Sequence, residues 1–189
     1  MDAEAALWTP PKMEGDAEPD ILATLKQVPL FQDLSGRDLK KVARLLHERT
    51  YQPGEVIFRE GDPGAGMYIV RKGKVNIVIG RPDGSEQLLA PIADRQFFGE
   101  MALLEAAPRS ASAVAAEKSE LLGFFQADLE SLIERDSKLG SKVVWNLARL
   151  MASRLRGMND VLRQQRQAEA AAAAVVAPAS ARPTGSEGM

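Results

Sequence analysis

A succession of short apolar runs separated by glycine-containing turns constrains the fold of this 189-residue chain more than any other feature. Between residues 51 and 125 the hydrophobic pattern approaches a period of two, which is the period of a β-strand. Turn sequences such as Gly61-Asp62-Pro63-Gly64 separate the runs. Closely spaced strands favour an antiparallel roll or sandwich over a βαβ sheet. The pattern predicts strands at 56–58, 67–70, 75–79, 87–89, 112–116 and 120–124.

Helical periodicity precedes the predicted strands. Apolar residues within 21–25 predict a short helix, and Ser35 is placed to cap a second helix whose apolar residues run up to Leu46. His47 falls near the end of this second helix. Because no chemical partner lies close to it in the sequence, we expect a structural or solvent-facing role for this single histidine.

Helical periodicity also follows the strands. A short amphipathic helix over 129–133 precedes a long helix whose apolar residues recur three or four positions apart. Such a narrow stripe is typical of a helix–helix seam. It is equally consistent with packing of the helix on its own β domain and with a dimer seam. The stripe consists of Val144, Leu147, Met151, Leu155, Met158 and Leu162.

Composition divides the chain into three segments. Residues 1–19 are acidic and contain prolines, which predicts a flexible arm; Trp8 is its one candidate anchor, and the alternatives are a docked tether and a disordered tail. Residues 20–165 form the predicted domain, including its C-terminal helix. Residues 166–189 are rich in alanine and proline, which predicts a disordered tail once Pro178 has ended the helix.

Several function classes are excluded or disfavoured by composition. The chain has no cysteine and one histidine, which argues against thiolate and His-cluster metal sites, cysteine catalysis and a His-dependent triad. We expect no enzyme, no metal and no cofactor. Its net charge of -2 provides no basic field for DNA or a membrane surface. No apolar run approaches the roughly 20 residues that span a bilayer. The N-terminus MDAEAALW does not resemble a signal peptide, so a cytoplasmic location is predicted.

Residues 97–114, FFGEMALLEAAPRSASAV, carry the candidate chemistry. Gly99 permits close approach of the backbone to a ligand, and a helical turn starting at Glu100 would present amides that attract an anion. Arg109 offers forked donors with a permanent charge, which suits a phosphate, and Ser110 adds a hydroxyl donor. Glu100 would be repelled by phosphate and is expected to accept hydrogen bonds from a sugar. From these pieces alone, an ordinary Glu100–Arg109 ion pair is an equal alternative.

The same segment resembles the phosphate-binding cassette of the cyclic nucleotide-binding domain family, the type found in the catabolite activator protein and in the regulatory subunit of protein kinase A. The family pattern reads FGE-[LIM]-A-[LI]-[LI], then a few residues, then PR-[STA]-A. Residues 98–104 and 108–111 match this pattern at every position. The upstream stretch YQPGEVIFREGDPGAGMYIVRKGKV is similar to the family as well, and the resemblance covers about residues 25–160.

This resemblance implies a mainly β fold: an antiparallel eight-stranded β-roll of the jelly-roll type, with flanking α-helices and a long C-terminal helix. It implies that Glu100 accepts the ribose 2′-hydroxyl and that Arg109 pairs with the cyclic phosphate. The ligand is cAMP by preference, with cGMP left open. The phosphate and ribose site implied by the family consists of Gly99, Glu100, Met101, Ala102, Arg109 and Ser110.

The base contacts are implied less specifically. Leu89 on the roll, with Met158 and Asn159 on the C-terminal helix, stand where family members contact the base, although Asn159 is equally well explained as an exposed helix residue. The turn before the cassette usually carries Gly-Asp in the family and here carries Arg95-Gln96. Because a non-glycine residue rarely adopts a positive φ, we expect this turn to be reshaped.

The expected output is regulation. DNA-binding relatives append a helix-turn-helix, and the residues after Gln165 contain no recognition helix. The sequence therefore predicts a stand-alone receptor in which the ligand moves the C-terminal helix and alters an unidentified protein partner or a homodimer, without DNA. The alternative is a ligand-free β-roll scaffold or interaction protein. A phosphodiesterase is disfavoured because no Asp/His cluster is present.

Overall fold

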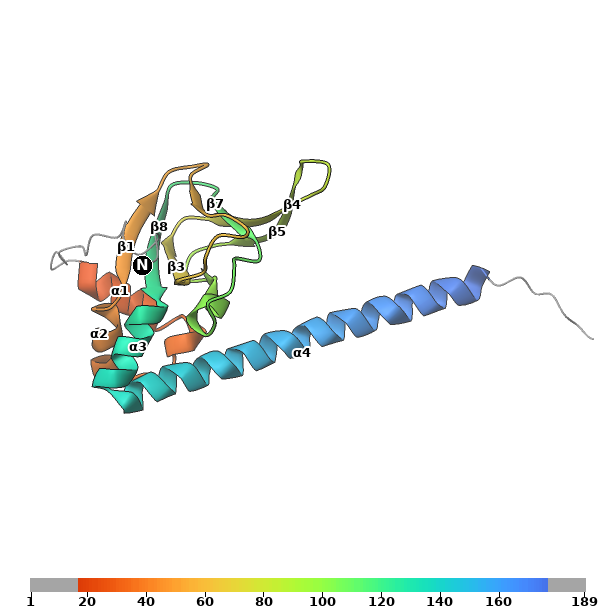
Figure 1. The fold of residues 1–189 in the computed structure, drawn as a ribbon. Coiled ribbons are helices and arrows are strands. Elements are labelled where there is room, and N and C mark those ends of the chain that lie inside the picture. The colour runs from red at the N-terminus through yellow and green to blue at the C-terminus, as the bar shows by residue number, and fades with distance from the viewer. Residues whose placement is uncertain (1–16, 177–189) are drawn as a thin grey trace, which may run out of the picture. The chain divides into compact units, whose positions relative to one another are not determined.

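The computed structural model describes residues 17–176, with side chains described for residues 20–168. The chain divides into two compact units, the first ending at Ala148 and the second beginning at Arg149. The first unit holds all of the strands, and the described part of the second is the continuation of one helix (Figure 1).

Eight strands in two antiparallel four-stranded sheets form the centre of the first unit, which confirms the predicted β-roll (Figure 1). The first sheet has the order β1-β8-β3-β6, and the second has the order β2-β7-β4-β5. Each predicted strand is present: β2 has the predicted bounds, and the ends of the others shift by up to three residues. The strands are β1 (His47–Tyr51), β2 (Val56–Phe58), β3 (Gly66–Lys72), β4 (Val75–Gly80), β5 (Glu86–Ile92), β6 (Phe97–Phe98), β7 (Ser112–Ala115) and β8 (Ser119–Phe125).

The helices lie before and after the strands, as the periodicity predicts. Ser35 caps the second of them, because its Oγ accepts a hydrogen bond from the Asp38 amide at 3.2 Å. One short 3-10 turn, η3, interrupts the strands between β6 and β7. The helical elements are α1 (Ala17–Leu25), η2 (Pro29–Phe31), α2 (Gly36–Ala43), η3 (Glu100–Leu103), α3 (Gln126–Arg135) and α4 (Ser137–Val176).

His47 corrects one expectation, because it begins strand β1 instead of lying near the end of a helix. Helix α2 already ends at Ala43, and His47 pairs with Gly123 of β8. The β1 sequence HERTY shows no apolar alternation, so only its pairing with β8 makes it a strand. The histidine also has a partner distant in sequence, since its Nε2 lies 3.1 Å from Oδ2 of Asp128 on α3.

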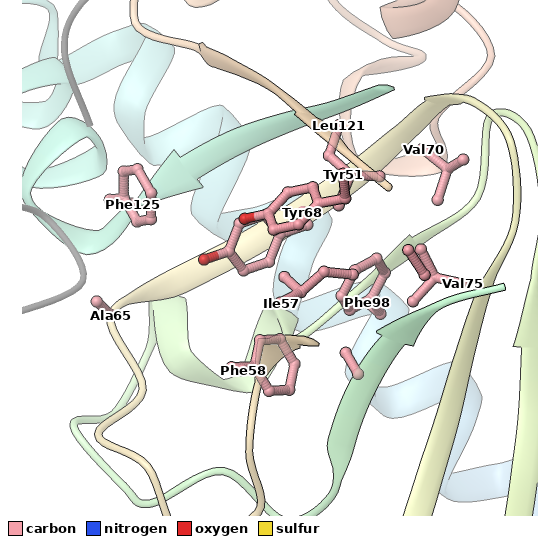
Figure 2. Packing of buried hydrophobic residues seen from close by; sticks show 12 residues of the cluster. Tyr51, Ile57, Phe58, Ala65, Tyr68, Val70, Val75, Phe98, Leu121 and Phe125 are labelled. Carbon is pink, nitrogen blue, oxygen red and sulfur yellow. The ribbon is translucent and has the colours of Figure 1, made fainter. Parts of the chain in front are cut away.

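The core between the two sheets is aromatic at its centre (Figure 2). The rings of Phe58, Tyr68 and Phe98 lie within 5.9 Å of one another, centroid to centroid, and Tyr68 and Phe98 are stacked. These three side chains come from β2, β3 and β6, so they join the two sheets. Smaller buried residues such as Val75, Ala113 and Ala115 fill the space around them.

The apolar stripe of α4 has two different ends. Within the first unit Leu147 is fully buried, and Asn146 next to it donates a hydrogen bond from Nδ2 to the Leu30 carbonyl at 3.1 Å. Within the second unit Leu155, Met158 and Leu162 are at least half exposed. Leu147 of the stripe therefore packs on its own domain, whereas Leu155, Met158 and Leu162 present apolar surface to solvent.

The expected segment boundaries differ from the ends of the elements. Helix α1 begins at Ala17, within the segment expected to be an arm, and α4 continues to Val176, into the segment expected to be a tail. The remainder of both segments, including Trp8 and Pro178, lies outside the described residues.

Candidate functional site

Gly99 has the backbone conformation on which the candidate site depends. It follows β6 with φ 76° and ψ 15°, the left-handed region that glycine adopts without steric cost. A Cβ atom at this position would lie 2.7 Å from Nη1 of Arg109. Two features therefore require glycine at residue 99: the left-handed backbone conformation of the turn, and the close approach of the Arg109 guanidinium.

The predicted helical turn follows Gly99 directly as η3. The Ala102 amide donates to the Gly99 carbonyl at 3.2 Å, and the Leu104 amide donates to the Met101 carbonyl at 2.9 Å. Gly64 lies against this turn, since a Cβ there would meet Cβ of Ala102 at 2.8 Å. The turn is thus packed closely on the loop that precedes β3.

Arg109 is buried, with 6% of its surface exposed. Its Nη1 donates to the Gly66 carbonyl at 2.7 Å and lies 3.4 Å from the Gly99 carbonyl. Its guanidinium carbon is 4.1 Å from the centroid of the Phe58 ring and 5.8 Å from that of Tyr68. Stacking on aromatic faces and donation to two carbonyls hold the guanidinium in one place.

The backbone of Arg109 is fixed as firmly as its side chain. Its amide donates to the Asp62 carbonyl, and its carbonyl accepts from the Gly61 amide, both at 2.8 Å. An isolated antiparallel bridge between Pro63 and Pro108 continues this pairing. The turn at residues 61–64, which the sequence indicates as a strand separator within the stretch that resembles the family, therefore positions the arginine.

Glu100 is the second buried charged residue of the segment, with 5% of its surface exposed. It is the first residue of η3 and follows Gly99, whose carbonyl faces Arg109. The structure thus brings Gly99, Glu100, Ala102 and Arg109 together beside the start of β3. A buried carboxylate and a buried guanidinium give this region groups for both a hydroxyl and a phosphate.

The other expected ligand residues are exposed. Met101 and Ser110 flank the buried pair, and 54% of the Met101 surface is open to solvent. Leu89 lies on β5, an edge strand, and is half exposed. Met158 and Asn159 are exposed on the part of α4 that belongs to the second unit. The described contacts therefore gather four of the six phosphate and ribose candidates, and the three base candidates are exposed residues.

The aromatic support of Arg109 was missed at the sequence level. Phe58 and Tyr68 read there only as strand residues, and no local spacing connects them with residue 109. The contact forms only when β2, β3 and the cassette meet in the fold, so no local sequence signal indicates it.

The turn before the cassette contains the positive φ that is rare for a residue other than glycine. Arg95 adopts φ 67°, so the arginine accepts the left-handed conformation that glycine would adopt at lower cost. The Gln96 amide donates to the Ala93 carbonyl at 3.1 Å, and the Arg95 amide donates to the Val70 carbonyl at 2.6 Å. These hydrogen bonds, together with that from the Ala93 amide to the Gln96 side chain, keep the turn closed.

Neither a metal site nor a membrane span is found among the described residues. No group of three or more carboxylate or imidazole side chains in this part of the chain is arranged to hold a metal ion. No described helix combines the length and the apolar character needed to cross a bilayer.

Comparison with known proteins adds to this geometry. Residues 48–136 match the family model described as the cyclic nucleotide-binding domain. The chain is 40% identical over 132 residues to the cyclic AMP receptor protein of Thermus thermophilus, covering 70% of this chain and 59% of the receptor. It is 42% identical over 91 residues to the cAMP-dependent protein kinase regulatory subunit of Colletotrichum orbiculare, covering 48% of this chain and 22% of the subunit.

A solved structure agrees with the fold. The crystal structure of a cyclic nucleotide-binding domain from Methylobacillus flagellatus KT matches with a TM-score of 0.68 and 26% identity, covering 79% of this chain and 84% of that domain. The chain spans less than two thirds of the length of the two curated relatives above. The similarity therefore concerns one domain of those proteins.

Proposed function

This chain belongs to the cyclic nucleotide-binding domain family, and on that premise we propose that it is a cyclic nucleotide receptor whose ligand is cAMP. The observation that carries the proposal is Arg109, a buried guanidinium held against the Gly66 carbonyl at 2.7 Å and stacked on Phe58. A phosphate that reaches such a group meets a charge whose position is already set, so little ordering is needed on binding.

The proposed roles follow the chemistry of the groups. Arg109 pairs with the cyclic phosphate, and Ser110 and the backbone around Met101 and Ala102 add donors. Glu100 accepts the ribose 2′-hydroxyl, because a carboxylate supplies only acceptors and a hydroxyl supplies a donor. Gly99 leaves room for the guanidinium, because a side chain there would begin only 2.7 Å from Nη1. The base contacts proposed for the purine are Leu89, Met158 and Asn159.

Calorimetric titration of the full chain with cAMP and with cGMP tests the proposal. We expect saturable binding of cAMP at one site per chain and weaker binding of cGMP. Binding of cGMP alone would replace the proposed ligand but keep the receptor. Failure of both nucleotides to bind would favour the ligand-free scaffold of the same fold.

We assign the chain no catalytic activity, a cytoplasmic location, and no DNA or membrane partner. Incubation with cAMP followed by a search for AMP tests the first assignment. A chain that released AMP at a rate proportional to its concentration would be an enzyme.

The proposed output runs through α4. Leu155, Met158 and Leu162 leave an apolar stripe on the second unit that is at least half exposed, which suits a homodimer seam or a protein partner. Binding of cAMP would change the position of this helix and thereby the partner it meets. Sedimentation with and without cAMP tests the dimer, and amide exchange along residues 149–168 tests the helix; identical exchange at saturating cAMP would contradict the mechanism.

A further inference from the structure

A basic face lies away from the cassette, where α2, the end of α3 and the start of α4 meet. Two adjoining cavities of about 300 and 350 Å³ open there and share Lys41 and Asp136 in their linings. Six cations and two carboxylates line them, so the face is strongly positive although the chain as a whole is negative. The cations are Arg37, Lys41, Arg44, Arg135, Lys138 and Lys142, and the carboxylates are Asp38 and Asp136.

The two carboxylates are both engaged with Lys41. Asp136 accepts a hydrogen bond from Lys41 Nζ at 2.6 Å, which lowers the pKa of the Asp136 carboxyl, and Asp38 lies 3.9 Å from the same Nζ. Among the side chains of residues 20–168, no salt bridge joins a carboxylate to Arg37, Arg44 or Arg135, and all three are exposed. The positive charge of these arginines is therefore available to an acidic occupant.

The first cavity has an apolar floor beneath this charge. Leu45 and the buried Leu132 line it together with Ser131, while Arg44 and Arg135 stand at its rim. An occupant that matches this lining combines carboxylates with one large apolar side chain. A nucleic acid or a free phosphate would satisfy the rim and leave the floor without a partner.

The chain itself contains a segment of this composition. Residues 1–16 carry Asp2, Glu4, Glu14 and Asp16 against the single Lys12, and Trp8 stands between the two acidic pairs. This segment joins α1 at Ala17, and α1 packs against α2, which supplies part of the basic face. Sixteen extended residues reach up to about 55 Å, more than the width of a domain of this size.

We propose that the acidic segment 1–16 docks on the basic face formed by α2, α3 and the start of α4, with Trp8 over Leu45 and Leu132. The face contains none of the residues proposed for the nucleotide, so the two proposals are tested by separate experiments. Segment 1–16 would then cover the basic face, and an acidic partner that binds there would have to displace this segment.

The test measures the fluorescence of Trp8, the residue proposed to dock. The chain has two tryptophans, and Trp145 is 68% exposed, so Trp145→Phe leaves Trp8 as the only indole without disturbing the core. In this full-length variant we expect Trp8 to be shielded from quenching by acrylamide at all protein concentrations. Arg44→Glu is expected to lower the equilibrium constant for docking of segment 1–16 about fivefold. The substitution replaces a cation that attracts the acidic segment with a carboxylate that repels it. About 1 M salt, where the Debye length is about 3 Å, should also expose Trp8.

Arg81→Glu is the matched control, since it makes the same change of charge at an exposed residue after β4 and should leave Trp8 shielded. Quenching as fast as that of a free tryptophan amide would overturn the proposal, as would shielding that Arg44→Glu leaves intact. Shielding lost on dilution would assign the face to the arm of a second copy and overturn the internal contact. Binding to phosphatidylserine vesicles while Trp8 stays accessible would assign the face to a membrane and overturn it too.

Discussion

Arg109 and Met158 are both assigned to the ligand by family resemblance, and their surroundings are opposite. The arginine is 6% exposed, with its backbone paired to the turn at residues 61–64 and its side chain held by two carbonyls and two rings. The methionine is 63% exposed on a helical segment of the second unit. Arg109, at the phosphate end of the proposed site, is thus prepared by the fold of the first unit, whereas Met158, proposed for the base end, is exposed and in this sense unprepared.

The largest expected effect comes from removing the prepared group. Arg109→Ala should lower the affinity for cAMP by more than about 100-fold, because at least two charge-assisted hydrogen bonds of about 1.5 kcal/mol each are lost. Calorimetry on the full chain measures this. Arg81→Ala is the control, because it removes the same charge from an exposed position whose side chain reaches only Gln87 at 3.4 Å. An affinity of the Arg109 variant within about tenfold of that of the unchanged chain would contradict the assigned role.

A pair of glycines separates backbone strain from the loss of space for Arg109. Gly99 and Gly54 have φ values of 76° and 79°, but only at Gly99 would a Cβ meet another group. Gly54→Ala should lower the free energy of unfolding by about 1–2 kcal/mol through strain alone. Gly99→Ala should lower it further and also weaken cAMP binding. Urea unfolding and calorimetry give both values, and equal losses of stability with equal affinities would show that the arginine does not depend on residue 99.

The turn before the cassette tests whether strain next to the prepared end serves binding. Arg95→Gly relieves a left-handed arginine at φ 67°, and the relief exceeds the entropy that glycine adds to the unfolded chain. We expect a gain of about 0.5–1 kcal/mol in the free energy of unfolding with unchanged affinity for cAMP. A loss of affinity in a more stable variant would mean that the strain positions the cassette.

The smallest effect is expected at the unprepared end. Met158→Ser should change the free energy of unfolding by less than about 0.5 kcal/mol, since the side chain is exposed. Its effect on cAMP affinity should stay below about tenfold, the value of one modest apolar contact. A loss as large as that of Arg109→Ala would remove the contrast between the two ends and show that the helix completes the site.

Local sequence signals predicted one part of this fold and site, and contacts between distant segments form the part that was not predicted. Strands such as β3 and β4 were found because apolar alternation and glycine turns are local signals. Strand β1 was missed because HERTY has no alternation and depends on β8 for its hydrogen bonds. The cassette was found because its motif is contiguous, whereas the Phe58 and Tyr68 platform and the His47–Asp128 pair arise only when distant segments meet.

The order in which the strands pair has a consequence for how the domain is made. Strand β1 pairs with β8, with His47 opposite Gly123. Strand β2 pairs with β7, with Val56 opposite Val114. The first two strands synthesised therefore cannot pair until the last two have been made. Such high contact order slows folding to about milliseconds or longer. A nascent chain that stops after the cassette would hold every residue proposed for phosphate and ribose and still lack the sheet that buries Arg109. The binding site is therefore completed late in synthesis, when residue 125 becomes free to pair.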